Sequence, residues 1–176
     1  LKKRSVVDFL LQKMGKFIDV IIPRGGKSLI HNVRQNSTIP VIKHLDGICH
    51  VFVDKDADIS IAEKVVFNSK MRRPGICGAA ETLLIHKNKS DDALKIIGRL
   101  VEAGCEIRGD AFIQSLSNKF SKATDKDWST EYLEKIISVK IVEDVEEAIN
   151  HINTFGSGHT ESIITNNSET FDIFQK

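Results

Sequence analysis

Residues 68–84 read NSKMRRPGICGAAETLL, and they join a helical pattern to an apolar strand through a Pro-Gly turn. Cys77 stands on that turn, with Arg72 and Arg73 five and four residues ahead of it. Nearby positive charge and access to solvent are the conditions under which a cysteine becomes reactive. A cysteine buried for packing is the commoner case when only local features are considered. The rest of the chain therefore decides whether Cys77 is a nucleophile or a packing residue.

Strand and helix patterns alternate on both sides of this stretch. Short apolar runs predict strands at residues 17–22, 39–42, 49–53, 81–86, 105–108, 136–142 and 162–165. Apolar residues at helical spacing predict helices at residues 4–14, 29–36, 59–70, 91–103 and 109–116, and Asp144 opens another. Asp58 is a good N-cap, and the polar residues 117–130 are expected to form a surface connection. The alternation predicts an α/β fold with a largely parallel sheet.

Length, charge and cysteine content exclude several classes of protein. The 176 residues suffice for one domain, or for one domain and a piece of another. A net charge of +1 gives no electrostatic surface for nucleic acid, and no apolar stretch approaches the roughly 20 residues that span a bilayer. The basic start resembles that of a signal peptide, but Asp8 breaks the apolar run behind it.

The three cysteines indicate a cytoplasmic protein with reduced thiols. Cys49, Cys77 and Cys105 are odd in number and form no Cys-x-x-Cys pair, which favours neither disulfides nor zinc. Cys49 and His50 are neighbours on a predicted strand, so their side chains point to opposite faces. Cys49 is therefore expected to pack, and the pair is not expected to form a metal site.

A glycine-rich turn follows the first predicted strand. Residues 23–28 read PRGGKS and lead into a predicted helix, which is the kind of unit that places anions at a helix N-terminus. The Gly26-Lys27-Ser28 ending imitates a nucleotide P-loop, but Ile21 stands where that motif requires a glycine. A loop that faces a cofactor and a plain tight turn are both compatible with this stretch.

Four ordered blocks carry a resemblance to a known family. They are DVIIPRGGK (19–27); IPVI (39–42) with GICHVFVD (47–54); RPGIC (73–77) with ETLL (81–84); and VKIV (139–142) with EAI (147–149) and GSGHT (156–160). In this order they resemble the γ-glutamyl phosphate reductase family, the acyl-phosphate-reducing branch of the aldehyde dehydrogenase superfamily. Four blocks in order are far more specific than any one of them.

The resemblance implies an aldehyde dehydrogenase-like catalytic domain with a largely parallel sheet, preceded by the last β-α units of a Rossmann-like cofactor domain. Residues 1–36 would then be the C-terminal remnant of the NADP-binding domain. Residues 37–176 would be a catalytic thiol domain that is truncated at its C-terminal end. Full members of the family are much longer, so the chain resembles their central catalytic portion.

The resemblance also makes Cys77 the catalytic nucleophile. The implied reaction is the NADPH-dependent reduction of γ-glutamyl phosphate to glutamate 5-semialdehyde and phosphate, a step of proline biosynthesis. Attack by the thiolate releases phosphate and leaves a thioester, which hydride then reduces. The backbone N–H of Cys77 is a natural donor to the oxygen that gains charge.

Residues that would hold NADPH or NADP follow from the same resemblance. Glu131 aligns with the glutamate that holds the nicotinamide ribose, and a carboxylate on a solvated turn is the alternative interpretation. Arg24, Gly25 and Gly26 are expected along the cofactor phosphates or the nicotinamide.

Residues that would hold the substrate lie in two stretches. Arg73, with Arg72 beside it, is expected to meet the substrate phosphate or to favour the thiolate, and solvated arginines are at least as simple an interpretation. The wall of the substrate pocket is expected to include Ser157, Gly158 and His159.

Three functions compete on these grounds. The first is the reductase, with a small-molecule substrate and with neither nucleic acid nor membrane as a partner. The second is a truncated, catalytically incompetent remnant or partner subunit, which would bind a complementary half or nothing. The abrupt ends favour it, and so does Gly78, which stands where family members commonly have Asn. A homo-oligomer is the other protein assembly considered. The third, a cysteine hydrolase that uses Cys77 and His159, rests on residue types alone.

Overall fold

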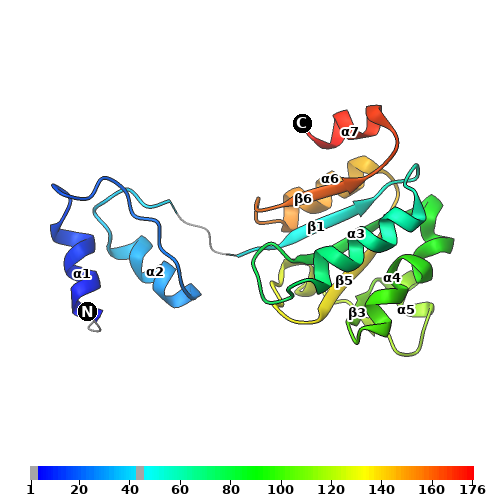
Figure 1. Cartoon of the computed structure of the whole chain (residues 1–176), viewed down its shortest axis with the longest axis horizontal. Coiled ribbons are helices and arrows are strands. Elements are labelled where there is room, and N and C mark those ends of the chain that lie inside the picture. The colour runs from blue at the N-terminus through cyan, green and yellow to red at the C-terminus, as the bar shows by residue number, and fades with distance from the viewer. Residues whose placement is uncertain (1–3, 43–45) are drawn as a thin grey trace. The chain divides into compact units, whose positions relative to one another are not determined.

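The computed structural model describes residues 4–42 and 46–176, and the chain divides into two compact units, Leu1–Leu45 and Asp46–Lys176 (Figure 1). The division comes after Leu45 because Val41 pairs with Ile21 of the first unit. The predicted domain boundary after residue 36 therefore falls inside the first unit.

The first unit contains two helices, α1 (Arg4–Lys13) and α2 (Lys27–Asn36). Leu11 of α1 and Ile30 and Val33 of α2 are buried, so the two helices share a small apolar core. Both helices agree with the sequence prediction to within two residues.

The strands predicted at residues 17–22 and 39–42 do not form as ladders. In the described part of this unit, the two segments meet in a single parallel bridge between Ile21 and Val41. The first segment begins with a turn instead, in which Phe17 N donates to Met14 O at 2.9 Å. An apolar run forms a strand only where neighbouring strands satisfy its backbone, and this pair lacks them within the unit.

The second unit is built on a six-stranded parallel sheet in the order β4-β3-β5-β2-β1-β6. Its strands are β1 (Cys49–Val53), β2 (Ala80–His86), β3 (Glu106–Gly109), β4 (Ser121–Lys122), β5 (Ile136–Val142) and β6 (Glu161–Ile164). Its helices are α3 (Ile59–Met71), η1 (Lys87–Asp92), α4 (Ala93–Glu102), α5 (Ala111–Ser115), η2 (Asp127–Ser129), α6 (Val145–Phe155) and α7 (Ser168–Phe174). The predicted α/β fold with a parallel sheet is confirmed.

Helices cover both faces of this sheet (Figure 1). On one face, α3 and α4 pack on strand residues such as Val51, Leu83 and Val139. On the other face, α6 and α7 pack on the intervening residues, among them Phe52 and Leu84. Successive strand residues point to opposite faces. This explains why continuous apolar runs, rather than alternating patterns, mark the central strands in the sequence.

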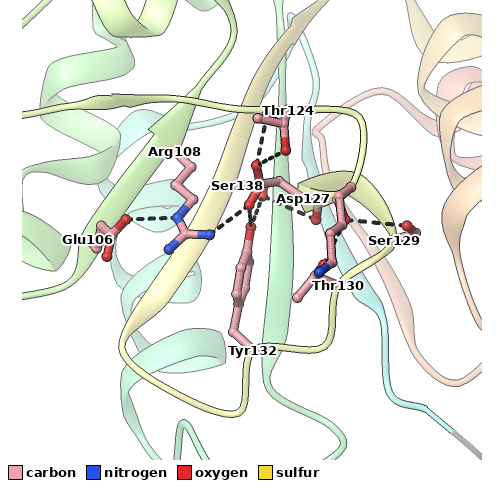
Figure 2. A network of polar contacts seen from close by, with 9 residues as sticks. Glu106, Arg108, Thr124, Asp127, Ser129, Thr130, Tyr132 and Ser138 are labelled. Atoms are coloured by element: carbon pink, nitrogen blue, oxygen red, sulfur yellow. Dashed lines mark hydrogen bonds and ion pairs between the residues drawn. The ribbon is translucent and has the colours of Figure 1, made fainter.

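The polar segment at residues 117–130 is not the simple surface connection that its sequence predicts. It contains β4 and η2, and it buries Asp127, which is 7% exposed. Figure 2 shows the carboxylate of Asp127 accepting hydrogen bonds from Arg108 Nη1 at 2.8 Å and from Tyr132 Oη at 2.8 Å. Thr124 Oγ1 donates to the second oxygen at 2.6 Å.

These contacts decide the charge of the buried carboxyl. Burial opposes ionisation, but the hydrogen bonds from Thr124 and Arg108 prevail and hold the pKa of Asp127 well below its usual range. The ionised Asp127 therefore ties its segment to β3, which carries Arg108, and to the residues before β5.

Candidate active site

The segments that precede β1, β2, β5 and β6 lie on the same side of the sheet, because these parallel strands all have their N-terminal ends there. Each segment contributes a residue to the candidate site: Gly47, Cys77, Glu131 and His159. Ligands of open parallel sheets usually bind at the carboxyl ends of the strands. This site lies on the opposite side, at the N-terminal ends of the strands.

Cys77 is the exposed thiol of the chain, whereas Cys49 and Cys105 are buried. Its Sγ lies 3.2 Å from Nε2 of His159, and Nδ1 of the same ring lies 2.7 Å from Oγ1 of Thr160. Burial raises the pKa of Cys49 and that of Cys105 to about 11, so both stay protonated near neutral pH. Of the three cysteines, Cys77 thus combines exposure with a contact to an imidazole.

Gly47 allows two backbones to approach closely beneath Cys77. A Cβ atom on Gly47 would lie 1.8 Å from Cys77 O and 2.7 Å from Cys77 Cα, so the position has no room for a side chain. The thiol of Cys49 donates to the same Cys77 carbonyl at 3.2 Å. The start of β1 therefore fixes the Cys77 loop by a close backbone contact and a hydrogen bond.

The turn that carries His159 is anchored to the same part of the chain. Ile48 N donates to Ser157 Oγ at 2.9 Å. Gly158 has a φ of 68°, which lies in the left-handed region that favours glycine. The imidazole lies beside Gly78, since a Cβ atom on that residue would be 3.7 Å from His159 Cε1. No side chain of residue 78 stands between the ring and Cys77.

A buried polar cluster supports this turn from inside. His50 N and His50 Nδ1 both lie 2.9 Å from Glu161 Oε2, two residues after His159. The rings of His50 and His151 meet edge to face, with centroids 5.6 Å apart. Burial, reinforced by the nearby His50 and Lys140, lowers the pKa of His151 to about 4. His151 is therefore neutral near neutral pH and acts as a packing residue.

Glu131 lies on the Gly47 side of the site. Its Oε1 accepts a hydrogen bond from Gly47 N at 2.8 Å. Two residues later, Leu133 has a φ of 56°, which is uncommon for a residue with a side chain. Leu133 N donates to Glu81 Oε1 at 3.2 Å, and Lys70 Nζ lies 2.6 Å from the other oxygen of this buried carboxylate. A buried ion pair thus holds the segment that places Glu131 against Gly47.

Most residues predicted for the thiol and substrate site come together on this side of the sheet. His159, Ser157 and Gly158 share one turn beside Cys77. Arg73 is exposed at the start of the Cys77 loop, where its carbonyl accepts from Ile76 N at 3.3 Å.

The predicted cofactor loop belongs to the first unit. Arg24 is exposed, and Gly25 has a φ of 152° with Leu29 packed close to it. Gly26 is the N-cap of α2 and gives it no side-chain cap.

Sequence reasoning missed the parts played by Gly47 and Cys49. Cys49 was expected only to pack, yet its thiol also bonds the Cys77 carbonyl. Gly47 directly precedes a predicted strand, and a glycine in that place often marks a close backbone approach. That signal was available in the sequence.

Comparisons with known proteins relate this chain to one kind of enzyme. No family model matches the chain. The γ-glutamyl phosphate reductase of Rhodopseudomonas palustris (strain BisB5) is 47% identical over 170 residues, which are 96% of this chain and 40% of that protein. The crystal structure of γ-glutamyl phosphate reductase from Thermotoga maritima matches 98% of this chain with a TM-score of 0.92 and 41% identity. The chain is homologous to part of γ-glutamyl phosphate reductase.

The chain spans about two fifths of the length of these relatives. The γ-glutamyl phosphate reductase of Paramagnetospirillum magneticum is 48% identical over 172 residues, again 40% of its length. The match to the Thermotoga maritima structure covers 42% of that chain.

More distant structures share the fold. An acetylating aldehyde dehydrogenase from Geobacillus thermoglucosidasius matches with a TM-score of 0.72 at 18% identity, over 98% of this chain and 46% of that one. An NADP-dependent glyceraldehyde-3-phosphate dehydrogenase from Bacillus halodurans matches with a TM-score of 0.74 at 22% identity, over 99% of this chain and 45% of that one. The second unit thus has an aldehyde dehydrogenase-like fold, as the sequence predicts.

Within residues 4–42 and 46–176, no helix has both the length and the apolar character needed to cross a membrane. The same residues contain no group of three or more His, Cys, Asp or Glu side chains arranged to hold a metal ion.

Proposed function

We propose that this chain provides the thiol site of a cytoplasmic γ-glutamyl phosphate reductase in proline biosynthesis. In this proposal Cys77 takes the γ-glutamyl group from γ-glutamyl phosphate, and NADPH reduces the resulting thioester to glutamate 5-semialdehyde. The observation that carries the proposal is the environment of Cys77. It is exposed, it is held on a loop that Gly47 and Cys49 fix, and its Sγ lies 3.2 Å from an imidazole nitrogen.

The chain's own residues would carry the acyl transfer. The Cys77 thiolate forms a bond to the acyl carbon, and the phosphate leaves with the electron pair of the broken C–O bond. The Cys77 N–H would donate to the carbonyl oxygen as it gains negative charge. Arg73, exposed on the same loop, would attract the leaving phosphate. Ser157 and Gly158 would line the substrate pocket beside His159.

The residues of the first unit fit a dinucleotide phosphate. Gly26 caps α2 without a side chain, and a Cβ atom on it would meet nothing within 4 Å, so residue 26 leaves the start of this helix open, where an anion would bind. The exposed Arg24 beside Gly25 adds positive charge. When bound, NADPH supplies the hydride that reduces the thioester.

Glu131 would hold the nicotinamide ribose. Its Oε1 accepts from Gly47 N, and a carboxylate has a second oxygen that can accept from a ribose hydroxyl. In the domain division that we propose, residues 1–36 belong to the NADP-binding domain and residues 37–176 to the catalytic domain.

Acylation tests the proposal without the cofactor. γ-Glutamyl phosphate, formed in place from glutamate and ATP by a glutamate kinase, is expected to add one γ-glutamyl group to the chain. Intact-protein mass spectrometry detects the adduct, and hydroxylamine removes it because it is a thioester. The Cys77→Ser variant should stay unmodified. A parent chain that is never acylated, or a Cys77→Ser variant that is acylated equally, would sink the proposal.

A second candidate function is a catalytically incompetent remnant or partner subunit of that enzyme. Gly78 favours it, because this residue follows the proposed nucleophile where family members commonly have Asn. The reverse reaction, phosphate-dependent reduction of NADP by glutamate 5-semialdehyde, separates the two functions. Acylation of Cys77 without NADP reduction supports the second candidate, whereas both activities together support the complete reductase.

A further inference from the structure

We propose that His159 is the general base that removes the thiol proton of Cys77, rather than a passive part of the pocket wall. The proposal rests on the proposed acyl-transfer function. Its central observation is the 3.2 Å separation between His159 Nε2 and Cys77 Sγ. Such a distance allows direct proton transfer between a sulfur and an imidazole nitrogen.

The two side chains are held together by one strand. At the start of β1, Cys49 Sγ donates to Cys77 O, and His50 N donates to Thr160 O at 3.4 Å. Both loops are therefore anchored within two neighbouring residues of β1. The contact between Cys77 and His159 follows from the parallel register of β1 with β2 and β6. A pair that is fixed from a common strand is preorganised for the reaction.

The second imidazole nitrogen supports the same role. Nδ1 of His159 lies 2.7 Å from Thr160 Oγ1, and we assign Nδ1–H as the donor in this contact. The lone pair of Nε2 then faces Cys77 Sγ, which is the tautomer that a base requires. Thr160 is a positioning residue, because it acts on the thiol only through the ring.

The proton and the bonds balance in this step. The S–H bond of Cys77 breaks and its proton moves to His159 Nε2, which leaves a thiolate beside an imidazolium. The thiolate forms a bond to the acyl carbon, and the C–O bond to phosphate breaks. The imidazolium returns its proton to the departing phosphate, so that the products are the thioester and hydrogen phosphate. The step consumes no oxidant or reductant.

Alkylation of Cys77 tests the proposal independently of any substrate. The rate of carbamidomethylation by iodoacetamide is measured by mass spectrometry from about pH 6 to about pH 10, over which ordinary thiols ionise. The variants are His159→Gln, which keeps polar atoms but cannot take up a proton, and His31→Gln, a matched change of an exposed histidine in the first unit.

We expect His159→Gln to slow alkylation by about tenfold or more near pH 7 and to leave the rate near pH 10 unchanged, because hydroxide can remove a thiol proton in strongly basic solution and a general base then gives no advantage. The His31→Gln variant should follow the parent at every pH. In His159→Ala, added imidazole should restore part of the lost rate near pH 7. The proposal would be overturned if the alkylation rate of His159→Gln near pH 7 were less than about threefold below that of the parent, or if the rate fell equally at both ends of the pH range.

Acylation by acetyl phosphate separates this inference from the proposed function. If the parent is acylated and His159→Gln is slowed by at least about tenfold, both stand. If the parent is alkylated with the expected pH dependence but no acyl phosphate acylates it, the base stands and the proposed function fails. If the parent is acylated and His159→Gln reacts at the same rate, the base is refuted and the proposed function stands.

Discussion

The Gly47→Ala substitution should disable Cys77 without touching any group that takes part in chemistry. The new Cβ atom would lie 1.8 Å from Cys77 O, and real Cβ atoms almost never approach closer than 3.0 Å. One of the two segments must therefore move by about 1.2 Å. Both segments are tied, since Gly47 N donates to Glu131 at 2.8 Å and Cys77 O accepts from Cys49 at 3.2 Å.

The structure sets the size of the expected effect. Overpacking of this kind costs about 1–3 kcal/mol, and the loss of one hydrogen bond adds about 1 kcal/mol. For a domain of this size, a loss of about 2–4 kcal/mol lowers Tm by about 5–15 °C. A displacement of about 1 Å in a reactive loop can cost about a hundredfold in rate. We therefore expect alkylation of Cys77 near neutral pH to slow by a factor of this order.

Thermal unfolding followed by circular dichroism and the rate of Cys77 alkylation are the two measurements. Gly98→Ala is the matched control, because a Cβ atom on this α4 residue would meet nothing within 4 Å. An alanine in a helix should raise stability by about 0.5–1 kcal/mol relative to glycine. If Gly47→Ala melts and reacts like the parent, the close backbone contact does not support the Cys77 loop.

Three further predictions concern thiols and pH. In the folded chain near pH 8, Ellman's reagent should modify Cys77 quickly and reach Cys49 and Cys105 only after denaturation, because burial raises the pKa of these two thiols to about 11; a second fast thiol would contradict this. Asp127→Asn should lose about 1–3 kcal/mol of stability at pH 7 in urea titrations. The difference in unfolding free energy between this variant and the parent should shrink as pH falls below about 4, because a carboxyl with a depressed pKa contributes stability that is lost on protonation. A difference that stays constant with pH would show that Asp127 is not ionised in the folded chain. Between about pH 7 and pH 4.5, the unfolding free energy of the parent should fall by about 2 kcal/mol because of His151. A histidine whose pKa is lowered to about 4 in the folded chain makes folding less favourable as pH falls. His151→Phe should lose correspondingly less over that range in the same titrations, and parallel losses would contradict the assignment.

Much of the fold was predictable because its signals are local. The strands at residues 49–53 and 136–142 have the predicted bounds, since both are rich in apolar residues and largely buried. The cap at Asp58 is also confirmed, because its oxygen accepts from Ile61 N within one turn. Neither feature depends on a distant part of the chain.

Residues 117–130 could not be predicted in the same way. Asp127 is buried because Arg108 and Tyr132 surround it, and these partners come from outside its own segment. A polar residue whose partners lie elsewhere in the sequence has no periodic pattern to reveal its burial.

The candidate site was predicted in its parts but not in its geometry. The ordered blocks lead to Cys77 and include His159, yet the two residues are separated by 82 positions. Their contact depends on the strand order that places β1 between β2 and β6, and the sequence does not state that order. Sequence reasoning could therefore pair the two residues only by their types, as in the hydrolase hypothesis, and it could not derive their contact.

The location of the site at the N-terminal ends of the strands has an electrostatic consequence. In a parallel α/β unit the connecting helices end, rather than begin, on this side of the sheet. Here α3 ends at Met71 before Cys77, and α6 ends at Phe155 before His159. Helix C-termini present carbonyl oxygens and a partial negative charge. They therefore offer no stabilisation to a thiolate or a bound phosphate at this end of the sheet. An enzyme built here cannot draw on helix dipoles for its anions in the second unit, so it must obtain positive charge from side chains such as Arg73.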